Sequence, residues 1–132
     1  KAFDTICHQH IIMGLVWRGI DPHVVHLVTE VYKNITTYID TRGDKMDPIG
    51  ILAGVTQGDP MSPVLFNLVL DPLLCRLETE GQGFHRGGLR ITAMAFSDDL
   101  VLLSDSWEGM CSNIKILETF CELTGLHTQG ER

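Results

Sequence analysis

Two adjacent carboxylates, Asp98 and Asp99, interrupt an otherwise apolar segment, AFSDDLVLLS at residues 95–104. Like charges side by side in a low-dielectric interior destabilise each other unless a cation lies between them. The flanking segments, LRITAMAF (89–96) and LVLLS, are rich in residues that form strands. The pattern therefore predicts a β-hairpin whose tip carries the two carboxylates, either as a two-residue turn or as a slightly wider one.

The chemistry of such a pair depends on where it points. Successive residues of a regular strand face opposite sides, whereas the strong twist at a hairpin tip lets both carboxylates approach one side. Oxygen ligands suit a hard cation such as Mg²⁺ or Mn²⁺, which also needs oxygens from elsewhere. The alternative is an exposed Asp-Asp turn that merely favours the hairpin, and the pair taken alone favours that interpretation.

The remaining segments predict one α+β domain. Apolar residues at helical spacing indicate four helices, the second of them capped by Asp21 and Pro22 and the last ending before Gly125. These helices are expected at residues 6–18, 22–33, 63–78 and 107–124. A strand at 35–40 (ITTYID), a polar turn at 41–47 and the segment PIGIL predict a second hairpin, and residues 80–88 a flexible connector.

Composition limits the class of protein. The 132 residues are 44% hydrophobic and 20% charged, which is typical of one globular domain. Because no apolar run reaches the roughly 18 residues of a membrane span, we expect no membrane partner. The net charge of −7 means that any contact with a nucleic acid backbone needs positive charge from other segments. The four cysteines lack metal-ligand spacing and are expected to be free thiols, mostly in the core.

A second segment, GVTQGDPMSP at residues 54–63, is a candidate binding loop. Gly54 and Gly58 expose backbone amides without a Cβ, and Gln57 offers a neutral donor and acceptor. The alternative is a helix start, in which Asp59 or Ser62 caps the following helix and Pro63 takes its first turn. The two interpretations are compatible because a helix N-terminus also favours a phosphate.

Four segments together resemble a known family. KAFD (1–4), GVTQGDPMSPVLFN (54–67), AFSDDLVLLS (95–104) and LTGL (123–126) are similar to four successive blocks of reverse transcriptases, in particular those of non-long-terminal-repeat (non-LTR, LINE-type) retrotransposons. The resemblance covers nearly the whole chain, in order. It implies an α+β fold with a polymerase palm-type antiparallel sheet, packed helices and part of the fingers, so that residues 1–132 form a partial reverse transcriptase domain.

The resemblance also implies a reaction. In this family a primer 3′-hydroxyl attacks the α-phosphate of a deoxynucleotide opposite an RNA template base, assisted by two Mg²⁺ or Mn²⁺ ions. Asp98 and Asp99 would be the catalytic and metal-binding residues. Phe3 matches the aromatic residue that rejects a 2′-hydroxyl. The residues implied in nucleotide binding are Ala2, Phe3, Gln57 and Gly58. The implied partners are an RNA template, a DNA primer and deoxynucleoside triphosphates.

The family pattern has one more carboxylate than this chain. Its principal metal ligand lies three residues before the position of Lys1, and Asp4 is instead expected to make a local hydrogen bond or cap. We therefore expect the isolated chain to have no polymerase activity and the thumb and endonuclease of a parent polyprotein to lie outside it. An active retrotransposon enzyme would be expected in the nucleus, although no localisation signal is visible.

Departures from the pattern support an alternative, a non-catalytic remnant, domesticated or derived from a pseudogene, that binds RNA or a protein partner. Thr56 replaces a usual Arg, Ser97 a usual Ala, and Gln129 and Arg132 depart from GLxxNxxK. A third reading is an RNA-templated RNA polymerase, in which Phe3 should give way to a smaller or polar residue.

Other side chains invite simpler interpretations. The helix histidines are expected to be surface or partly satisfied residues rather than metal ligands, and the tryptophans to pack in the core or at its rim. The residues concerned are His8, His10, His23, His26, Trp17 and Trp107. By family analogy, the basic residues best placed to meet template or primer are Arg18, Lys33, Arg42 and Lys45, although scattered solvated charges are the commoner outcome.

Overall fold

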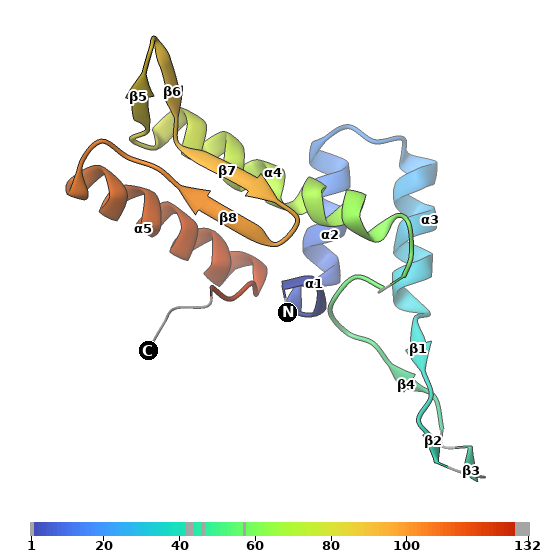
Figure 1. Ribbon diagram of the computed structural model, residues 1–132. Coiled ribbons are helices and arrows are strands. Elements are labelled where there is room, and N and C mark those ends of the chain that lie inside the picture. Colours follow the sequence, from blue (N-terminus) through green and yellow to red (C-terminus); the bar gives the residue numbers. More distant parts are fainter. Residues whose placement is uncertain (1, 42–43, 46, 57, 129–132) are drawn as a thin grey trace.

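The computed structural model describes residues 2–41, 44–45, 47–56 and 58–128 of the chain, with helices and short antiparallel strands. Figure 1 shows a central hairpin lying between two long helices, a helical layer beside it, and an arm of short strands that extends away from both. The elements are α1 (Ala2–Thr5), α2 (His8–Trp17), α3 (Pro22–Lys33), β1 (Thr36–Thr37), β2 (Asp40–Thr41), β3 (Asp44–Lys45), β4 (Ile49–Gly50), α4 (Ser62–Glu80), β5 (Phe84–Arg86), β6 (Leu89–Ile91), β7 (Ala93–Phe96), β8 (Asp99–Leu102) and α5 (Trp107–Thr124). The predicted α+β composition is confirmed.

The second predicted helix is confirmed at both ends by α3. The Asp21 side chain accepts a hydrogen bond from the His23 backbone N–H at 2.8 Å, and Pro22 occupies the first turn. The first predicted helix, α2, begins two residues later than expected, at His8. Helix α2 packs against α3 and α4, and Arg18 at its end forms an ion pair with Asp71 of α4.

The arm contains the predicted hairpin in a reduced form. Strand β1 pairs with β4 and β2 with β3, both antiparallel. The single strand expected over residues 35–40 is wrong, because only Thr36–Thr37 and Asp40–Thr41 are in strand conformation. The side chains of β1 and β4 are exposed, so burial adds nothing to the β-propensity of this segment.

Helix α4 supplies the apolar base of the fold. Its inward face buries a row of side chains, Leu65, Phe66, Val69, Leu73 and Leu77. Most of this row belongs to a core cluster that also contains Ile6, from the link between α1 and α2, and Ile11, Leu15, Val28 and Tyr32 from α2 and α3.

The start of α4 corrects the capping prediction. Met61 occupies the N-cap position without a side-chain cap. The Asp59 carboxylate accepts a hydrogen bond from the Met61 N–H at 2.9 Å, one turn ahead of the helix. The Ser62 hydroxyl donates to the Thr56 carbonyl at 2.6 Å instead of capping the helix. Pro63 lies in the first turn as predicted.

The segment predicted to be a connector forms a hairpin instead. Strand β5 pairs with β6 through a turn in which Gly87 and Gly88 both have positive φ, the conformation that tight hairpins require. The strand expected over 89–96 is broken at the buried Thr92, whose carbonyl accepts a hydrogen bond from Leu103 N–H at 2.8 Å. The break lets β6 and β7 join different hairpins.

The hairpin of β7 and β8 packs on α4 and α5. Leu100 and Leu102 are half-buried whereas Asp99 and Val101 are exposed, so the strand alternates as a one-sided sheet should. Helix α5 confirms the last predicted helix. It is capped by the Ser106 side chain, which accepts from Gly109 N–H, and it ends at Gly125 with φ +75°.

Two expectations about packing hold only in part. The four cysteines are free thiols as expected, but none is fully buried: Cys75 is exposed, Cys7 and Cys111 are half-buried, and Cys121 is half-buried and packs against the core cluster. Trp17 and Trp107, which were expected in the core or at its rim, are 60% and 75% exposed, so neither is in the core. Within the ranges that the structure describes, no helix is long and apolar enough to cross a membrane.

Candidate functional site

The turn of the β7–β8 hairpin lies one residue earlier than an Asp-Asp turn would. Phe96 pairs with Asp99, so the two turn residues are Ser97 and Asp98, and Asp99 is the first residue of β8. Ser97 has φ +55°, a left-handed conformation that is uncommon for residues other than glycine. Both carboxylates are exposed at the tip.

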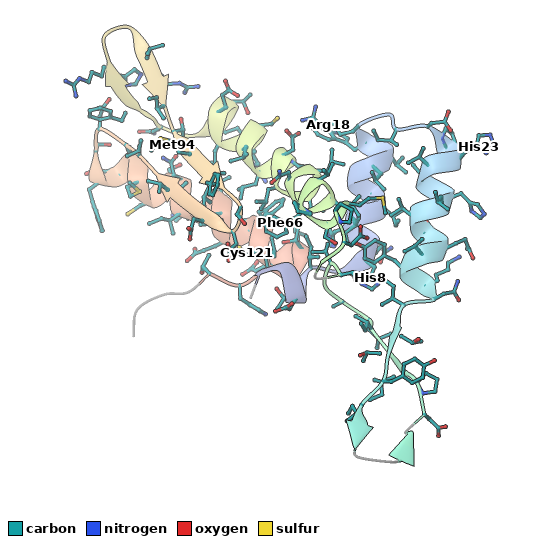
Figure 2. All side chains as sticks on the ribbon, turned by 45° about the vertical axis from the view of Figure 1, so that its right-hand side comes forward. His8, Arg18, His23, Phe66, Met94 and Cys121 are labelled. Atoms are coloured by element: carbon teal, nitrogen blue, oxygen red, sulfur yellow. The ribbon has the colours of Figure 1, made fainter. Side chains whose placement is uncertain are left out.

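A pocket of about 430 Å³ opens beside the two carboxylates. Its walls come from α4, α5 and the segment after α5, and in Figure 2 the labelled Phe66 and Cys121 lie in this central region between the helices. The lining residues are Phe66, Leu70, Leu73, Asp98, Asp99, Leu100, Leu117, Phe120, Cys121, Leu126, His127 and Thr128. The pocket thus joins a polar rim to an apolar floor.

Two further residues of this pocket, Cys121 and His127, bear on whether it can bind a metal ion. Burial, with a smaller contribution from Glu118, raises the pKa of the Cys121 thiol, which keeps it protonated and a poor metal ligand. His127 lines the same pocket as the Asp pair and was not singled out from the sequence. Its position directly after the LTGL block is the signal that could have found it.

The donor set at the hairpin tip fits part of a divalent-cation site. Neither the Asp98 nor the Asp99 side chain has a hydrogen bond or ion pair with another residue among those placed by the structure, so their carboxylate oxygens are available. In the described ranges no group of three or more His, Cys, Asp or Glu side chains is arranged to hold a metal. Two carboxylates supply only part of the oxygen shell that Mg²⁺ or Mn²⁺ requires.

The candidate binding loop is fixed to the N-terminal segment at Gly54. The Gly54 N–H donates to the Ile6 carbonyl at 2.8 Å, and the His8 Nε2 lies 2.9 Å from the Gly54 carbonyl. Gly54 has φ +92°, and a Cβ there would lie 2.9 Å from the Asp4 backbone. This position therefore requires glycine for both conformation and space.

The far side of the loop is anchored at the start of α4. The Thr56 carbonyl accepts from the Ser62 hydroxyl and, at 3.3 Å, from the Asp59 N–H. Gly58, with φ +89°, is exposed and faces open space. Gln57 lies outside the described residues, as do the side chains of Ala2 and Phe3, whose backbone forms α1.

Helix α1 is the point where the sequence blocks meet. Asp4 adjoins Gly54 of the loop, and the Thr5 carbonyl lies 3.5 Å from where a Cβ of Gly125 would be. The residues after Gly125 line the pocket together with Asp98 and Asp99. The structure thus brings the segments that contain KAFD, GVTQGD, FSDD and LTGL into one connected region.

The other candidate residues have mostly local roles. The Arg18 guanidinium lies 5.4 Å from the Trp17 ring centroid and pairs with Asp71, while Lys33 pairs with Glu30 at 3.1 Å. His23 and His26 are exposed on α3, and Figure 2 shows His23 at the outer end of that helix. Arg42 lies outside the described residues and so does the side chain of Lys45.

Comparison with known proteins gives a consistent result. A family model described as reverse transcriptase (RNA-dependent DNA polymerase) matches residues 1–131. The chain is 39% identical over its full length to a retrovirus-related Pol polyprotein from type-1 retrotransposable element R2 of Popillia japonica, covering 19% of that protein. Identity is 38% over 98% of the chain to the Nasonia vitripennis R2 polyprotein, covering 12% of it. For the type-2 element R2DM of Drosophila melanogaster it is 34% over the full chain, also covering 12%. The chain therefore spans less than a fifth of the length of these relatives.

Proposed function

The chain belongs to the reverse transcriptase family, and from that premise we propose that it is the palm-centred part of an RNA-directed DNA polymerase of a non-LTR retrotransposon. The polypeptide that contains it would add deoxynucleotides to a primer 3′-hydroxyl on an RNA template. One observation carries this proposal: two exposed carboxylates at a hairpin tip border a pocket in the region where the loop and helix α1 converge.

The palm assignment is supported by the one-sided packing of β7 and β8 on two helices. Both outer edges of this strand pair are unpaired in the part of the chain that the structure describes. A further strand that carries the third carboxylate of the family pattern can therefore join the sheet through backbone hydrogen bonds.

Asp98 and Asp99 would hold the divalent ions, since exposed carboxylate oxygens without protein partners suit Mg²⁺ or Mn²⁺. When bound, two such ions activate the primer hydroxyl and neutralise charge on the leaving pyrophosphate. Asp99 shares its sheet face with the exposed apolar side chains of Met94, Phe96 and Val101, on which the end of a primer can rest.

The nucleotide would lie between helix α1 and the loop. Ala2 and Phe3 would bound the sugar, and Gln57 and Gly58 would line the opposite side. The exposed, unobstructed backbone at Gly58 lies just before the N-terminus of α4, where the positive end of a helix dipole favours a triphosphate.

The test uses a polypeptide extended upstream through the family's first carboxylate. We expect template-directed primer extension that falls by at least about 100-fold in Asp98→Asn, because a metal ligand is lost. Asp21→Asn is the matched control, since asparagine caps α3 as well as aspartate does. Mn²⁺ binding should weaken in Asp98→Asn only, and equal binding by both variants would remove Asp98 from the metal site.

The isolated 132-residue chain should show no primer extension. Template-directed synthesis by this chain alone would contradict the assignment of an essential carboxylate to the upstream segment.

A non-catalytic remnant that binds RNA or a protein partner is the second candidate. It is supported by the exposed Thr56, which offers no positive charge to a triphosphate, and by the ion pairs that engage Arg18 and Lys33. An extended polypeptide that binds RNA but extends no primer in Mg²⁺ or Mn²⁺ would favour this candidate.

A further inference from the structure

His8, the first residue of α2, connects three elements of the fold. Its Nε2 lies 2.9 Å from the Gly54 carbonyl, and its ring packs edge-on against Tyr32 of α3, with 4.7 Å between ring centroids. Figure 2 shows His8 where α2 and α3 approach the loop. Because a carbonyl oxygen only accepts hydrogen bonds, Nε2 must carry the hydrogen in the neutral ring as well as in the charged one.

The contact of His8 completes a two-sided attachment of Gly54. The Gly54 N–H is already bound to the Ile6 carbonyl, and Cys7 and Ala53 form an antiparallel bridge beside it. With a Cβ position only 2.9 Å from the Asp4 backbone, Gly54 has no room to shift toward α1. The first residue of the loop, Gly54, is therefore held in a fixed position next to α1.

The loop is anchored again at its other end, and Val55, which follows Gly54, is buried in the core. Ser62 holds the Thr56 carbonyl, and the Asp59 carboxylate accepts from the Met61 N–H. Tyr32 is buried next to this second anchor, and burial raises the pKa of its hydroxyl. The Tyr32 hydroxyl has no hydrogen bond of good geometry in the described part of the chain, although the Ser62 hydroxyl and Thr56 carbonyl lie close to it.

The hydrogen bond between Gly54 N–H and the Ile6 carbonyl lies at equal sequence distance from the two sides of the proposed nucleotide pocket, and the His8 contact supports it at the Gly54 carbonyl. Phe3 lies three residues before Ile6, and Gln57 lies three residues after Gly54. The Ile6 backbone and the His8 side chain thus both join the segment that leads to Phe3 to the segment that leads to Gln57.

We propose that His8 is a positioning residue of the nucleotide pocket: it holds Gly54, the start of the loop, against the N-terminal segment and so sets the discrimination between deoxynucleotides and ribonucleotides. This inference rests on the proposed polymerase function. His8 acts through the Gly54 carbonyl, without touching the nucleotide. Its contribution comes from pre-organising the loop, which lowers the ordering cost of nucleotide binding.

The experiment measures single-nucleotide incorporation of dTTP and UTP opposite a template adenine by the upstream-extended polypeptide. His8→Phe keeps the ring against Tyr32 but removes the donor. His8→Gln removes the ring and keeps an amide donor. His26→Phe, an exposed change on α3, is the matched control.

We expect His8→Phe to raise KM for dTTP by about five-fold, the effect of losing one ordinary hydrogen bond, with kcat changed less than about two-fold. The ratio of kcat/KM for dTTP to that for UTP should fall by a similar factor. His8→Gln should recover most of both effects, and His26→Phe should match the wild type.

Amide hydrogen exchange in the same polypeptide separates positioning from general stability. Faster exchange confined to Thr56, Gly58 and Asp59 in His8→Phe supports the proposal. Uniformly faster exchange throughout α2 and α3, or an unchanged dTTP to UTP ratio in an active His8→Phe variant, overturns it. A wild-type polypeptide that incorporates no nucleotide overturns the polymerase function itself, and this inference with it.

Discussion

The β7–β8 hairpin and the arm formed by β1 to β4 are both antiparallel hairpins, yet they differ in what lies behind them. The β7–β8 pair packs on α4 and α5, so that Leu100 and Leu102 are half-buried. In the arm, which extends away from the helices in Figure 1, Tyr38 is 65% exposed and Leu52 is 88% exposed.

The difference shows that strand-forming residues alone do not make an ordered platform here. ITTYID has a higher density of β-branched residues than AFSDDLVLLS, but it yields only two-residue strands. A helical layer that buries alternate side chains gives the second hairpin four-residue strands and a fixed register. The candidate metal residues lie on the hairpin that is supported in this way, as a precise site requires.

The largest effect is expected when a buried side chain of α4, which supports the β7–β8 hairpin, is removed. Phe66→Ala deletes a ring that is 1% exposed, in α4, at the floor of the pocket. We expect the free energy of unfolding to fall by about 3–5 kcal/mol, from lost burial and the cavity left behind. Urea unfolding followed by circular dichroism measures the change.

The matched change in the arm is Tyr38→Ala, another aromatic truncation. Because this ring is largely exposed, we expect a change within about 0.5 kcal/mol. Equal losses in the two variants would show that the arm also depends on packing, which contradicts the distinction.

A polar residue holds the opposite end of the supported hairpin. Asn113 of α5 is fully buried and its side chain accepts from Gln82 N–H at 2.9 Å while donating to the Gln82 carbonyl at 3.0 Å and the Leu103 carbonyl at 3.3 Å. Asn113→Leu should lower the free energy of unfolding by about 2–4 kcal/mol, because backbone groups lose their partners in a low-dielectric site.

The control for Asn113 is Asn67→Leu on the exposed side of α4, which should be nearly neutral. The urea unfolding midpoints and m-values of both variants measure the difference in stability. An Asn113→Leu variant as stable as the wild type would mean that leucine packing offsets the lost hydrogen bonds and that Asn113 does not secure the hairpin.

Some of this architecture follows from local sequence signals. The Asp21-Pro22 pair predicts the start of α3 because a carboxylate cap and a first-turn proline both suit a helix N-terminus. Gly125 predicts the end of α5 because glycine adopts positive φ without strain. The interrupted apolar pattern around Asp98 and Asp99 predicts a hairpin with carboxylates at its tip.

Other features depend on contacts between distant segments and could not be predicted locally. An Asp-Asp turn is locally reasonable, but the observed register pairs Phe96 with Asp99 and places Ser97 and Asp98 in the turn. Gly54 was expected to supply free amides, whereas its N–H and carbonyl are bound by Ile6 and His8, more than 45 residues away. Contacts between distant segments decide the outcome at Gly54, where tertiary structure overrides the local expectation.

The β5–β6 hairpin is an intermediate case, and it gives the smallest predicted effect. It has exposed strand side chains like the arm, but His85 is tied to Asp105, the residue that follows Ser104 before α5. The Asp105 carboxylate accepts from His85 Nδ1 at 2.5 Å and from the His85 backbone N–H at 3.1 Å. The hydrogen bond from the His85 ring, followed by the one from the His85 backbone N–H, lowers the pKa of Asp105 from its ordinary value of 3.8.

A carboxylate whose pKa is lowered by folding stabilises the fold at pH values above its unfolded pKa, and this contribution is lost as pH falls through the lower, folded pKa. We therefore expect the unfolding free energy of the wild type to exceed that of Asp105→Asn by a small margin at pH 5, and the margin to vanish toward pH 2. The exposure of both side chains keeps the margin small and sensitive to salt. Asp47→Asn, an exposed carboxylate in the arm, controls for the change in net charge. A margin for Asp105→Asn that is constant from pH 5 to pH 2 would show that the tie to His85 does not depend on the ionised carboxylate, and no margin at pH 5 would show that this hairpin is as independent of its surroundings as the arm.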